Sequence, residues 1–218
     1  MRRALTASLK SCAIPGSALP TSRYPVFRAL LYPLLLSLLA VLYTPHSVAT
    51  DAGKTDMQKE WRSIAALSQL NYWVGFQSVP IKGEFRKFSV RYKPGDTLLV
   101  SVDIRSAEMG DSELNSEIAA ADWFDSKHFA EARFVSNSIA SINDTDNQFL
   151  ASGTLQLKGI SRTIAVPFSW QPDGHITGEL VIPRTDFAIG SGQWSSSDQI
   201  GVDVRVSFDV RLQSDAAE

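Results

Sequence analysis

The feature that most constrains the fold is the regular alternation of apolar and polar residues along the chain after about residue 67. It is clearest over residues 201–212, where the even-numbered positions from 202 onward are apolar and the odd-numbered positions from 203 are polar or charged. Successive side chains of a β-strand point to opposite faces of a sheet, so a period of two predicts strands with one apolar face. Sheets with one dry and one solvated face are typically antiparallel.

Eight segments carry this pattern in a strong or weaker form, and turn-forming runs such as Lys93-Pro94-Gly95-Asp96 separate them. Within the second segment the apolar phase changes between Phe85 and Phe88, which predicts a bulge or a sharp bend. The predicted strands are residues 68–76, 82–92, 97–106, 132–142, 148–158, 162–170, 175–183 and 201–212.

Short strands in sequence order must hide their edges by closure or by stacking. We expect an all-β fold, an eight-stranded antiparallel barrel whose interior is filled by side chains or holds one small ligand. A two-sheet sandwich is the alternative. Residues 111–124 favour a helical insertion between strands 3 and 4, which suits a lid or plug at one end of the barrel. Residues 56–66 form either a short helix or, from Trp61, the start of an edge strand.

The first 49 residues differ from the rest of the chain, because they hold five basic side chains and no acidic one. Residues 29–43 are an uncharged run, shorter than the roughly 20 residues of a membrane-spanning helix, and Ser47-Val48-Ala49 follows as a small-x-small pattern. We expect a signal peptide (1–49) cleaved after about Ala49 and an exported protein. An uncleaved N-terminal anchor is the alternative. The remainder is predicted as a lead-in, a barrel domain and a C-terminal tail (50–66, 67–213, 214–218).

Composition excludes several classes of function. Residues 50–218 carry 16 basic and 23 acidic side chains, a net charge of −7, so nucleic acid is not expected as a main partner. The only cysteine, Cys12, lies in the leader, which excludes a structural disulfide, a cysteine-ligated metal and a cysteine nucleophile from the rest of the chain.

Residues for acid–base or metal chemistry are few. His128 and His175 are the only histidines after the leader, and neither belongs to an H-E-x-x-H pattern. A metal site at His128 with Asp122 and Asp125 was weighed against a surface histidine, and the surface histidine is favoured. No G-x-S-x-G elbow is present. We therefore predict neither a catalytic residue nor a metal site.

Four blocks of the chain, in order, resemble the YceI-like family over about residues 60–213. Ala188 departs from the family pattern, which usually has glycine there, and the "D..HS" opening of the family is replaced by Ala66-Leu67-Ser68-Gln69-Leu70. The resembling blocks are Asp122-Trp123-Phe124-Asp125 with residues 132–136, the hairpin 153–162, Arg184-Thr185-Asp186-Phe187-Ala188-Ile189-Gly190, and the final strand 202–212.

The resemblance implies a lipocalin-like, mostly periplasmic barrel that holds a long polyisoprenoid or quinone-like lipid in an apolar tunnel. No other cofactor is expected. Some members of the family occur beside a membrane cytochrome of the b561 type, so the resemblance also implies a transient membrane or cytochrome partner. Burial of the apolar chain, at roughly 25 cal/mol per Å², would supply the binding free energy.

Inward positions of the predicted strands supply the expected ligand contacts. Arg184 and Asp186 would face one side of an extended segment, either to bind a polar headgroup or to fix a loop through an ion pair or hydrogen bonds. The predicted ligand-contacting residues are Tyr72, Phe85, Val102, Phe134, Leu155, Phe168, Phe187 and Phe208.

Two other functions were weighed against a carrier or storage protein. The first is an enzyme acting on a small lipophilic substrate, with Asp186, His128 or His175 as acid or base. It requires an ionisable pair that converges inside the barrel. The second is a packed barrel that serves as an interaction module for a membrane redox partner, with no tunnel and one exposed apolar patch.

Overall fold

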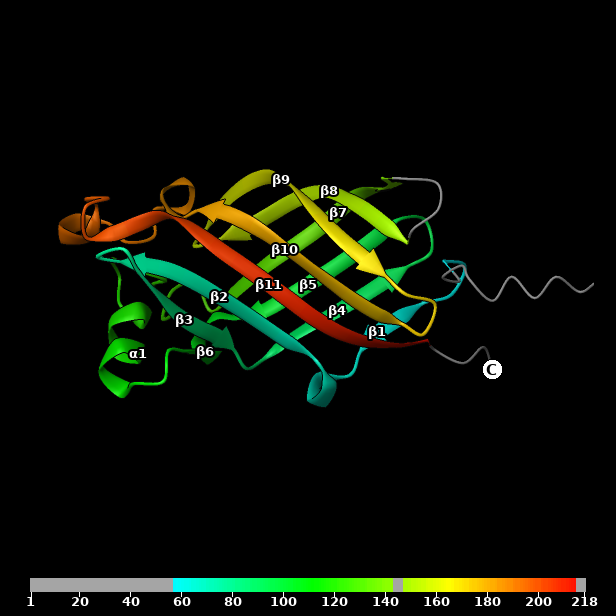
Figure 1. Ribbon diagram of the computed structural model, residues 1–218, viewed down its shortest axis with the longest axis horizontal. Helices are drawn as coiled ribbons and strands as arrows, with labels where there is room; N and C mark the ends of the chain where they lie inside the picture. Colours follow the sequence, from blue (N-terminus) through cyan, green and yellow to red (C-terminus); the bar gives the residue numbers. More distant parts are fainter. Residues whose placement is uncertain (1–56, 143–146, 215–218) are drawn as a thin grey trace, which may run out of the picture. The chain divides into compact units, whose positions relative to one another are not determined.

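In the computed structural model, which describes residues 57–142 and 147–214, eight antiparallel strands pair edge to edge into a closed ring (Figure 1). Each strand of the ring pairs with the next, and β1 pairs with both β4 and β11, which completes the circle. The ring strands are β1 (Trp61–Ser63), β4 (Phe88–Lys93), β5 (Thr97–Asp103), β7 (Glu131–Ser141), β8 (Gln148–Leu157), β9 (Ile160–Trp170), β10 (His175–Pro183) and β11 (Ile200–Ser214).

Three further strands extend the wall at one end of the ring. β2 (Gln69–Phe76) pairs with the same edge of β11 as β1 does, and it forms a hairpin with β3 (Val79–Phe85). The short strand β6 (Ala107–Glu108) pairs with the end of β3. All three therefore belong to the same antiparallel sheet as the ring.

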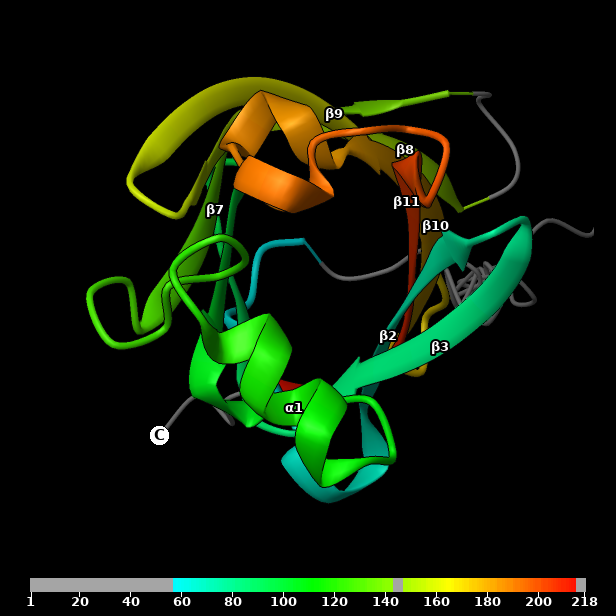
Figure 2. The ribbon, with the colours of Figure 1, turned by 90° about the vertical axis from the view of Figure 1, so that its left-hand side faces the viewer.

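Helical segments lie mostly at this extended end, which faces the viewer in Figure 2. The α-helix α1 (Ser112–Ala119) begins after Asp111, whose carboxylate accepts hydrogen bonds from the backbone N–H groups of Glu113 and Leu114. Four 3-10 turns complete the described part: η1 (Ala65–Leu67), η2 (Ile104–Ser106), η3 (Arg184–Phe187) and η4 (Gly192–Trp194).

The predicted eight-stranded antiparallel barrel is confirmed, and the sandwich alternative is not. The segment 82–92 is two strands, β3 and β4, and they join where the apolar phase changes between Phe85 and Phe88. The pairing of β11 with β2 shifts register between Ile200 and Val204, and Val202 is not part of the cavity wall described below.

The N-terminal segment and the helix differ from the prediction in extent. Trp61 starts a strand rather than a helix, and this strand closes the ring instead of lying at an edge. The barrel therefore begins inside the predicted lead-in 50–66. α1 occupies part of the predicted helix 111–124 and lies between β5 and β7, as expected. The predicted signal peptide lies outside the described residues.

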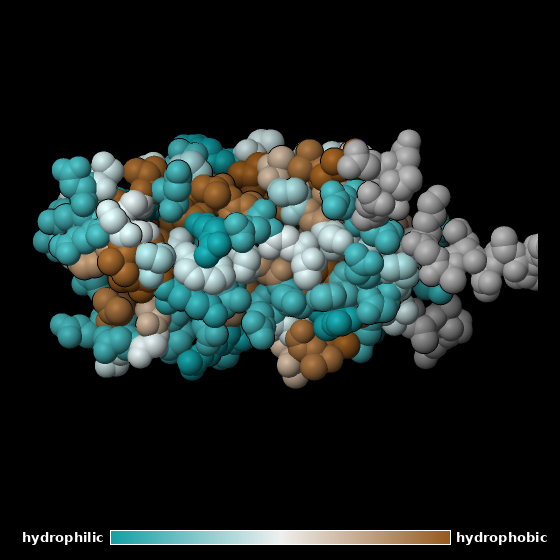
Figure 3. Space-filling view, viewed as in Figure 1, coloured by the Kyte–Doolittle hydropathy of each residue, from teal (hydrophilic) through white to brown (hydrophobic). Residues whose placement is uncertain are grey.

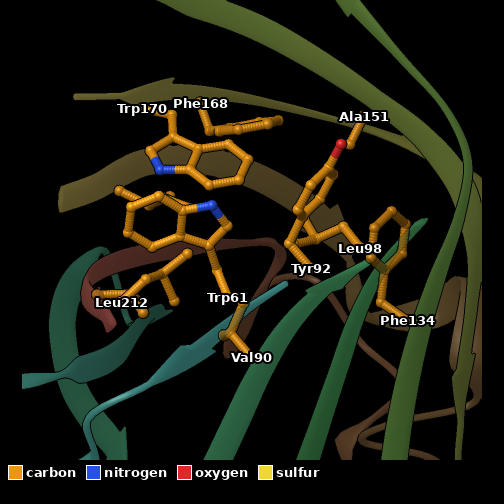
Figure 4. Close-up of a cluster of buried hydrophobic side chains, with 11 residues drawn as sticks. Trp61, Val90, Tyr92, Leu98, Phe134, Ala151, Phe168, Trp170 and Leu212 are labelled. Carbon is orange, nitrogen blue, oxygen red and sulfur yellow. The ribbon is translucent and has the colours of Figure 1, made fainter. Parts of the chain in front are cut away.

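Large aromatic side chains fill the end of the barrel opposite α1. The Trp170 ring packs edge-on against Trp61 and Tyr92, with centroid distances of 5.9 and 4.9 Å (Figure 4). Trp170 and Tyr92 are almost completely buried, and the Tyr92 hydroxyl donates a hydrogen bond of 3.1 Å to the Met57 carbonyl. We call these three rings the floor, and they belong to a buried apolar cluster that closes this end.

The face of the molecule seen in Figure 3 is mainly polar, with separate apolar patches. One patch lies over η1, where Leu67 is 60% exposed. At the opposite end Phe76 and Val79 expose apolar area on the β2–β3 hairpin, and Leu114 does so on α1. Within the described residues, no helix combines the length and the hydrophobicity needed to cross a membrane.

Candidate ligand-binding site

A cavity of about 300 Å³ lies inside the ring. Its wall is built from the inward, apolar positions of β2, β3, β4, β5, β7, β8, β9, β10 and β11 and from side chains of α1, η3 and η4. Among the described residues of this wall, Glu117 and Arg184 are the only charged ones. The cavity is therefore suited to an apolar molecule with few polar groups.

The structure brings all eight sequence-predicted contact residues to this wall. Period-two alternation explains six of them, since each lies at an inward position of its strand, whereas Phe187 comes from η3 and Phe85 ends β3. Their contact with a ligand remains a prediction. The eight are Tyr72, Phe85, Val102, Phe134, Leu155, Phe168, Phe187 and Phe208.

Two connecting segments cover the cavity at the end opposite the floor, and we call residues 117–124 and 184–194 the roof (Figure 2). The Trp194 indole N–H donates a 2.8 Å hydrogen bond to Glu117 Oε1, and its ring packs 5.9 Å from that of Trp123. The Ser191 backbone N–H donates to the Asp122 carbonyl at 2.8 Å. These contacts join segments more than sixty residues apart in the chain.

Lys158 ties the turn between β8 and β9 to both halves of the roof. Its ammonium group donates 2.8 Å hydrogen bonds to the carbonyls of Ala121 and Ala188. Partial burial lowers the pKa of the Lys158 ammonium group. Ala188 takes a left-handed conformation with φ of 52°, at the position where the YceI-like pattern usually has glycine.

Arg184 is the centre of the roof. It is almost completely buried, and all five of its N–H groups donate to backbone carbonyls at 2.8–3.1 Å. Burial lowers the pKa of its guanidinium. Of the two roles weighed for this residue, the structure supports the fixing of a loop. The accepting carbonyls belong to Ile189, Gly190, Trp194, Ile200 and Gly201.

The prediction that Arg184 and Asp186 face the same side is wrong. The prediction assumed an extended segment, but these residues lie in the 3-10 turn η3, where residues two apart point in different directions. Asp186 is exposed, whereas Arg184 points into the roof. Asp186 is not part of the cavity wall.

Two polar atoms of the wall lack hydrogen-bond partners among the described residues, although both are buried: the Tyr72 hydroxyl and the Trp123 indole nitrogen. Tyr72 is 5% exposed and Trp123 is 8% exposed. Burial is the main cause that raises the pKa of Tyr72, and the nearby Glu108 charge adds to it. The hydroxyl is therefore neutral at physiological pH.

Sequence reasoning missed Glu117, Trp123 and Trp194 as wall residues. They lie in connecting segments, where no periodicity marks an inward position. The one available signal was the resemblance of residues 122–125 to a block of the YceI-like family, which contains Trp123.

The residues considered for acid–base chemistry do not converge. The His128 Nδ1 atom lies 2.7 Å from Asp125 and the His175 Nε2 atom lies 2.9 Å from Asp209, both pairs being outside the cavity wall. None of the three residues considered as acid or base, Asp186, His128 and His175, therefore lies in the cavity wall. The described residues include no group of three or more His, Cys, Asp or Glu side chains placed to hold a metal ion.

The closed antiparallel barrel with an apolar interior defines a lipocalin-like class of protein. The YceI-like domain model matches residues 61–212, which is nearly all of the described chain. The protein therefore belongs to the YceI-like family. No match was found among curated proteins.

Solved structures of the same fold support this assignment. BcnA of Burkholderia cenocepacia is 30% identical, with a TM-score of 0.63 over 69% of this chain and 99% of that chain. A polyisoprenoid binding domain from Saccharophagus degradans is 17% identical, with a TM-score of 0.58 over 71% and 98%. The YceI protein of Campylobacter jejuni is 19% identical, with a TM-score of 0.52 over 63% and 86%. The last two likenesses concern the fold alone.

Proposed function

We propose that this protein is exported to the periplasm and there carries or stores a long isoprenoid lipid or quinone-like molecule. The observation that supports this most directly is the apolar cavity inside a closed barrel. The similarity to a structure described as a polyisoprenoid binding domain supports the class of ligand. The basic leader, with its short apolar run and small-x-small pattern, supports export.

Burial of apolar surface would hold the ligand. Each Å² of apolar surface removed from water contributes roughly 25 cal/mol, so an isoprenoid tail needs few polar contacts to bind tightly. The cavity volume of about 300 Å³ is at the lower end of the range of about 300–1,000 Å³ for ligand pockets. A chain that exceeds this volume displaces wall side chains or leaves one end outside.

The closed floor gives the ligand an orientation. Trp61, Tyr92 and Trp170 fill one end of the barrel, so the tail points toward them and the headgroup lies under the roof. A transient partner in the membrane, including a cytochrome of the b561 type, would deliver or receive the lipid at the roof end.

The test is to purify the protein from the periplasm of its native host and to measure its mass under native conditions. Solvent extraction followed by mass spectrometry identifies any bound lipid. We expect a complex heavier than the apoprotein and an isoprenoid or quinone in the extract. Sequencing of the purified chain should start near Thr50, directly after the expected cleavage site.

Two neighbouring residues of β10 provide matched variants. Leu180 lines the cavity, whereas Val181 points outward and is 57% exposed. Leu180→Trp should reduce the recovered lipid by about tenfold or more, because the indole takes up cavity volume, while Val181→Trp should retain it. An apoprotein mass for the wild type, with no isoprenoid in the extract, would refute the proposal. Equal loss from both variants would refute the cavity as the binding site.

A further inference from the structure

Two buried polar groups of the wall form no hydrogen bond that would stabilise the fold, as far as the described residues show. The Tyr72 hydroxyl and the Trp123 indole N–H make no hydrogen bond to any described residue, and each side chain is more than nine-tenths buried. Buried polar groups are paired in the great majority of cases, because an unpaired one costs roughly 1–3 kcal/mol. Both groups line the cavity, so a bound molecule is placed to supply their partners.

Phe124 lies near both groups. Its ring is 6.5 Å from that of Tyr72, which also contacts the Phe85 ring at 5.0 Å. Phe124 directly follows Trp123 in the chain and packs against two buried apolar clusters, one of which contains Trp123. Both polar groups therefore belong to the part of the cavity wall near the roof.

The Tyr72 ring lies directly over Gly83 of β3. A Cβ atom at Gly83 would come within 2.2 Å of the ring, so the phenol occupies the space that glycine leaves open. The backbone pairing of Tyr72 with Gly83 sets this arrangement, since the two residues are opposite each other in the β2–β3 hairpin.

The chemistry of these two groups selects an acceptor. The indole N–H can only donate, and a neutral phenol donates readily to a carbonyl oxygen. Among the described residues of the wall, Arg184 is the only cation, and all five of its N–H groups are already bonded to carbonyls. The other charged wall residue is Glu117, which repels an anion. A phosphate would therefore lose its hydration without gaining a counter-charge.

We propose, resting on the lipid-binding function above, that Tyr72 and Trp123 form a headgroup subsite that selects isoprenoids with a neutral, hydrogen-bond-accepting oxygen over phosphorylated ones. The Tyr72 hydroxyl and the Trp123 indole N–H each donate to an oxygen of the headgroup. Neither residue is needed for the tail to bind, because the apolar wall holds it.

The test compares three probes that share one polyprenyl tail, which ends in a benzoquinone, in a phosphate or in a plain hydrocarbon. Native mass spectrometry gives the dissociation constant of each. The wild type should bind the quinone most tightly and the phosphate least tightly. Tyr72→Phe should reduce the preference for quinone over hydrocarbon by roughly two- to tenfold, the range for one hydrogen bond. Trp123→Phe should reduce it similarly.

Tyr92→Phe is the matched control, because Tyr92 is equally buried but belongs to the floor and donates to Met57. It should leave the preference unchanged. A second readout is the infrared carbonyl band of the bound quinone, which hydrogen bonding shifts to lower frequency and which Tyr72→Phe should shift back. The unliganded Tyr72→Phe protein should be at least as stable as the wild type, since the removed hydroxyl has no partner.

The outcomes separate this inference from the proposed function. If no probe binds, the lipid-binding function itself fails. If quinone and hydrocarbon bind equally and Tyr72→Phe changes nothing, the function stands and the subsite is refuted. Binding of the phosphate probe as tightly as the quinone would also refute the selectivity, as would a marked loss of stability in unliganded Tyr72→Phe.

Discussion

The replacement of Arg184 by methionine tests how the roof is held. Methionine keeps the apolar stem of the side chain and removes every donor, so five backbone carbonyls lose their partners at once. Three of the five hydrogen bonds are buried. The change therefore removes one guanidinium and leaves the eight-stranded ring in place.

The expected loss in the free energy of unfolding is about 3–4 kcal/mol. Hydrogen bonds to charged groups contribute roughly 1.5–3 kcal/mol each, so five independent ones would exceed 7 kcal/mol. They are not independent, because the segment can open and its carbonyls can then bond to water. The cost of opening the roof therefore limits the effect, and one or two carbonyls that stay buried without a partner, at roughly 1–3 kcal/mol each, account for the expected loss.

Urea unfolding followed by far-ultraviolet circular dichroism measures this loss. Arg184→Lys should be intermediate, because an ammonium has three donors in place of five. The matched control is Arg205→Met on β11, where the guanidinium lies 4.3 Å over the Trp73 ring and 3.7 Å from Glu179 at the surface. That change should cost no more than about 1 kcal/mol.

If Arg184→Met lowers the free energy of unfolding by less than about 1 kcal/mol, and the slope of that free energy against urea concentration is unchanged, this account of the roof is refuted. Equal losses at positions 184 and 205 would also refute it, because the buried hydrogen bonds of Arg184 would then contribute no more than the surface contacts of Arg205.

Three further predictions concern the cavity and the floor. Gly83→Ala should cost about 1–3 kcal/mol in thermal unfolding, because its Cβ would overlap the Tyr72 ring, whereas at Gly75 the nearest atom is 3.9 Å away and Ala should be tolerated. Tyr72→Phe should leave the tyrosinate absorbance of the folded protein at high pH unchanged and reduce that of the unfolded protein, because burial raises the Tyr72 pKa above its ordinary value of 10.0. Stability should accordingly fall as the pH rises above 10, where the unfolded chain releases the Tyr72 proton and the folded one keeps it. Trp170→Ala should cost about 3–5 kcal/mol by emptying the floor, as measured by urea unfolding, and more than the same change at the half-buried Trp73.

Each of these has a clear contrary result. Equal stability of the two alanine variants at positions 83 and 75 would contradict the close packing of the phenol. A loss of tyrosinate signal from folded Tyr72→Phe at a pH near 10 would mean that the hydroxyl reaches water. A loss of under 1 kcal/mol for Trp170→Ala would mean that the floor collapses around the gap.

The faces of the strands could be predicted from the sequence because neighbouring side chains must point to opposite sides of a pleated sheet. That rule placed Val102, Phe134 and Phe168 on the cavity wall without any tertiary information. The same rule marked an irregularity between Phe85 and Phe88. It was predicted as a bulge or bend within one strand, and it is the place where β3 ends and β4 begins.

The strand β1 could not be identified in this way, because three residues are too short to show a period. Its position depends on partners in β4 and β11, which lie far away in the chain. The direction of the Arg184 side chain and the place of Trp123 in the cavity wall could not be predicted for a similar reason. Local turns and contacts between distant loops set the directions of these side chains, and neither has a sequence period.

The seam between β1 and β11 has a consequence for how the nascent chain matures. It joins Ser63 to Leu212, which are 149 residues apart, so almost the whole polypeptide must be present before the cylinder can be sealed. Closing so large a loop is slow compared with forming hairpins. Until then two strand edges stay open to pairing with other molecules. A chain that is truncated just before residue 212 should therefore form an unsealed, aggregation-prone sheet.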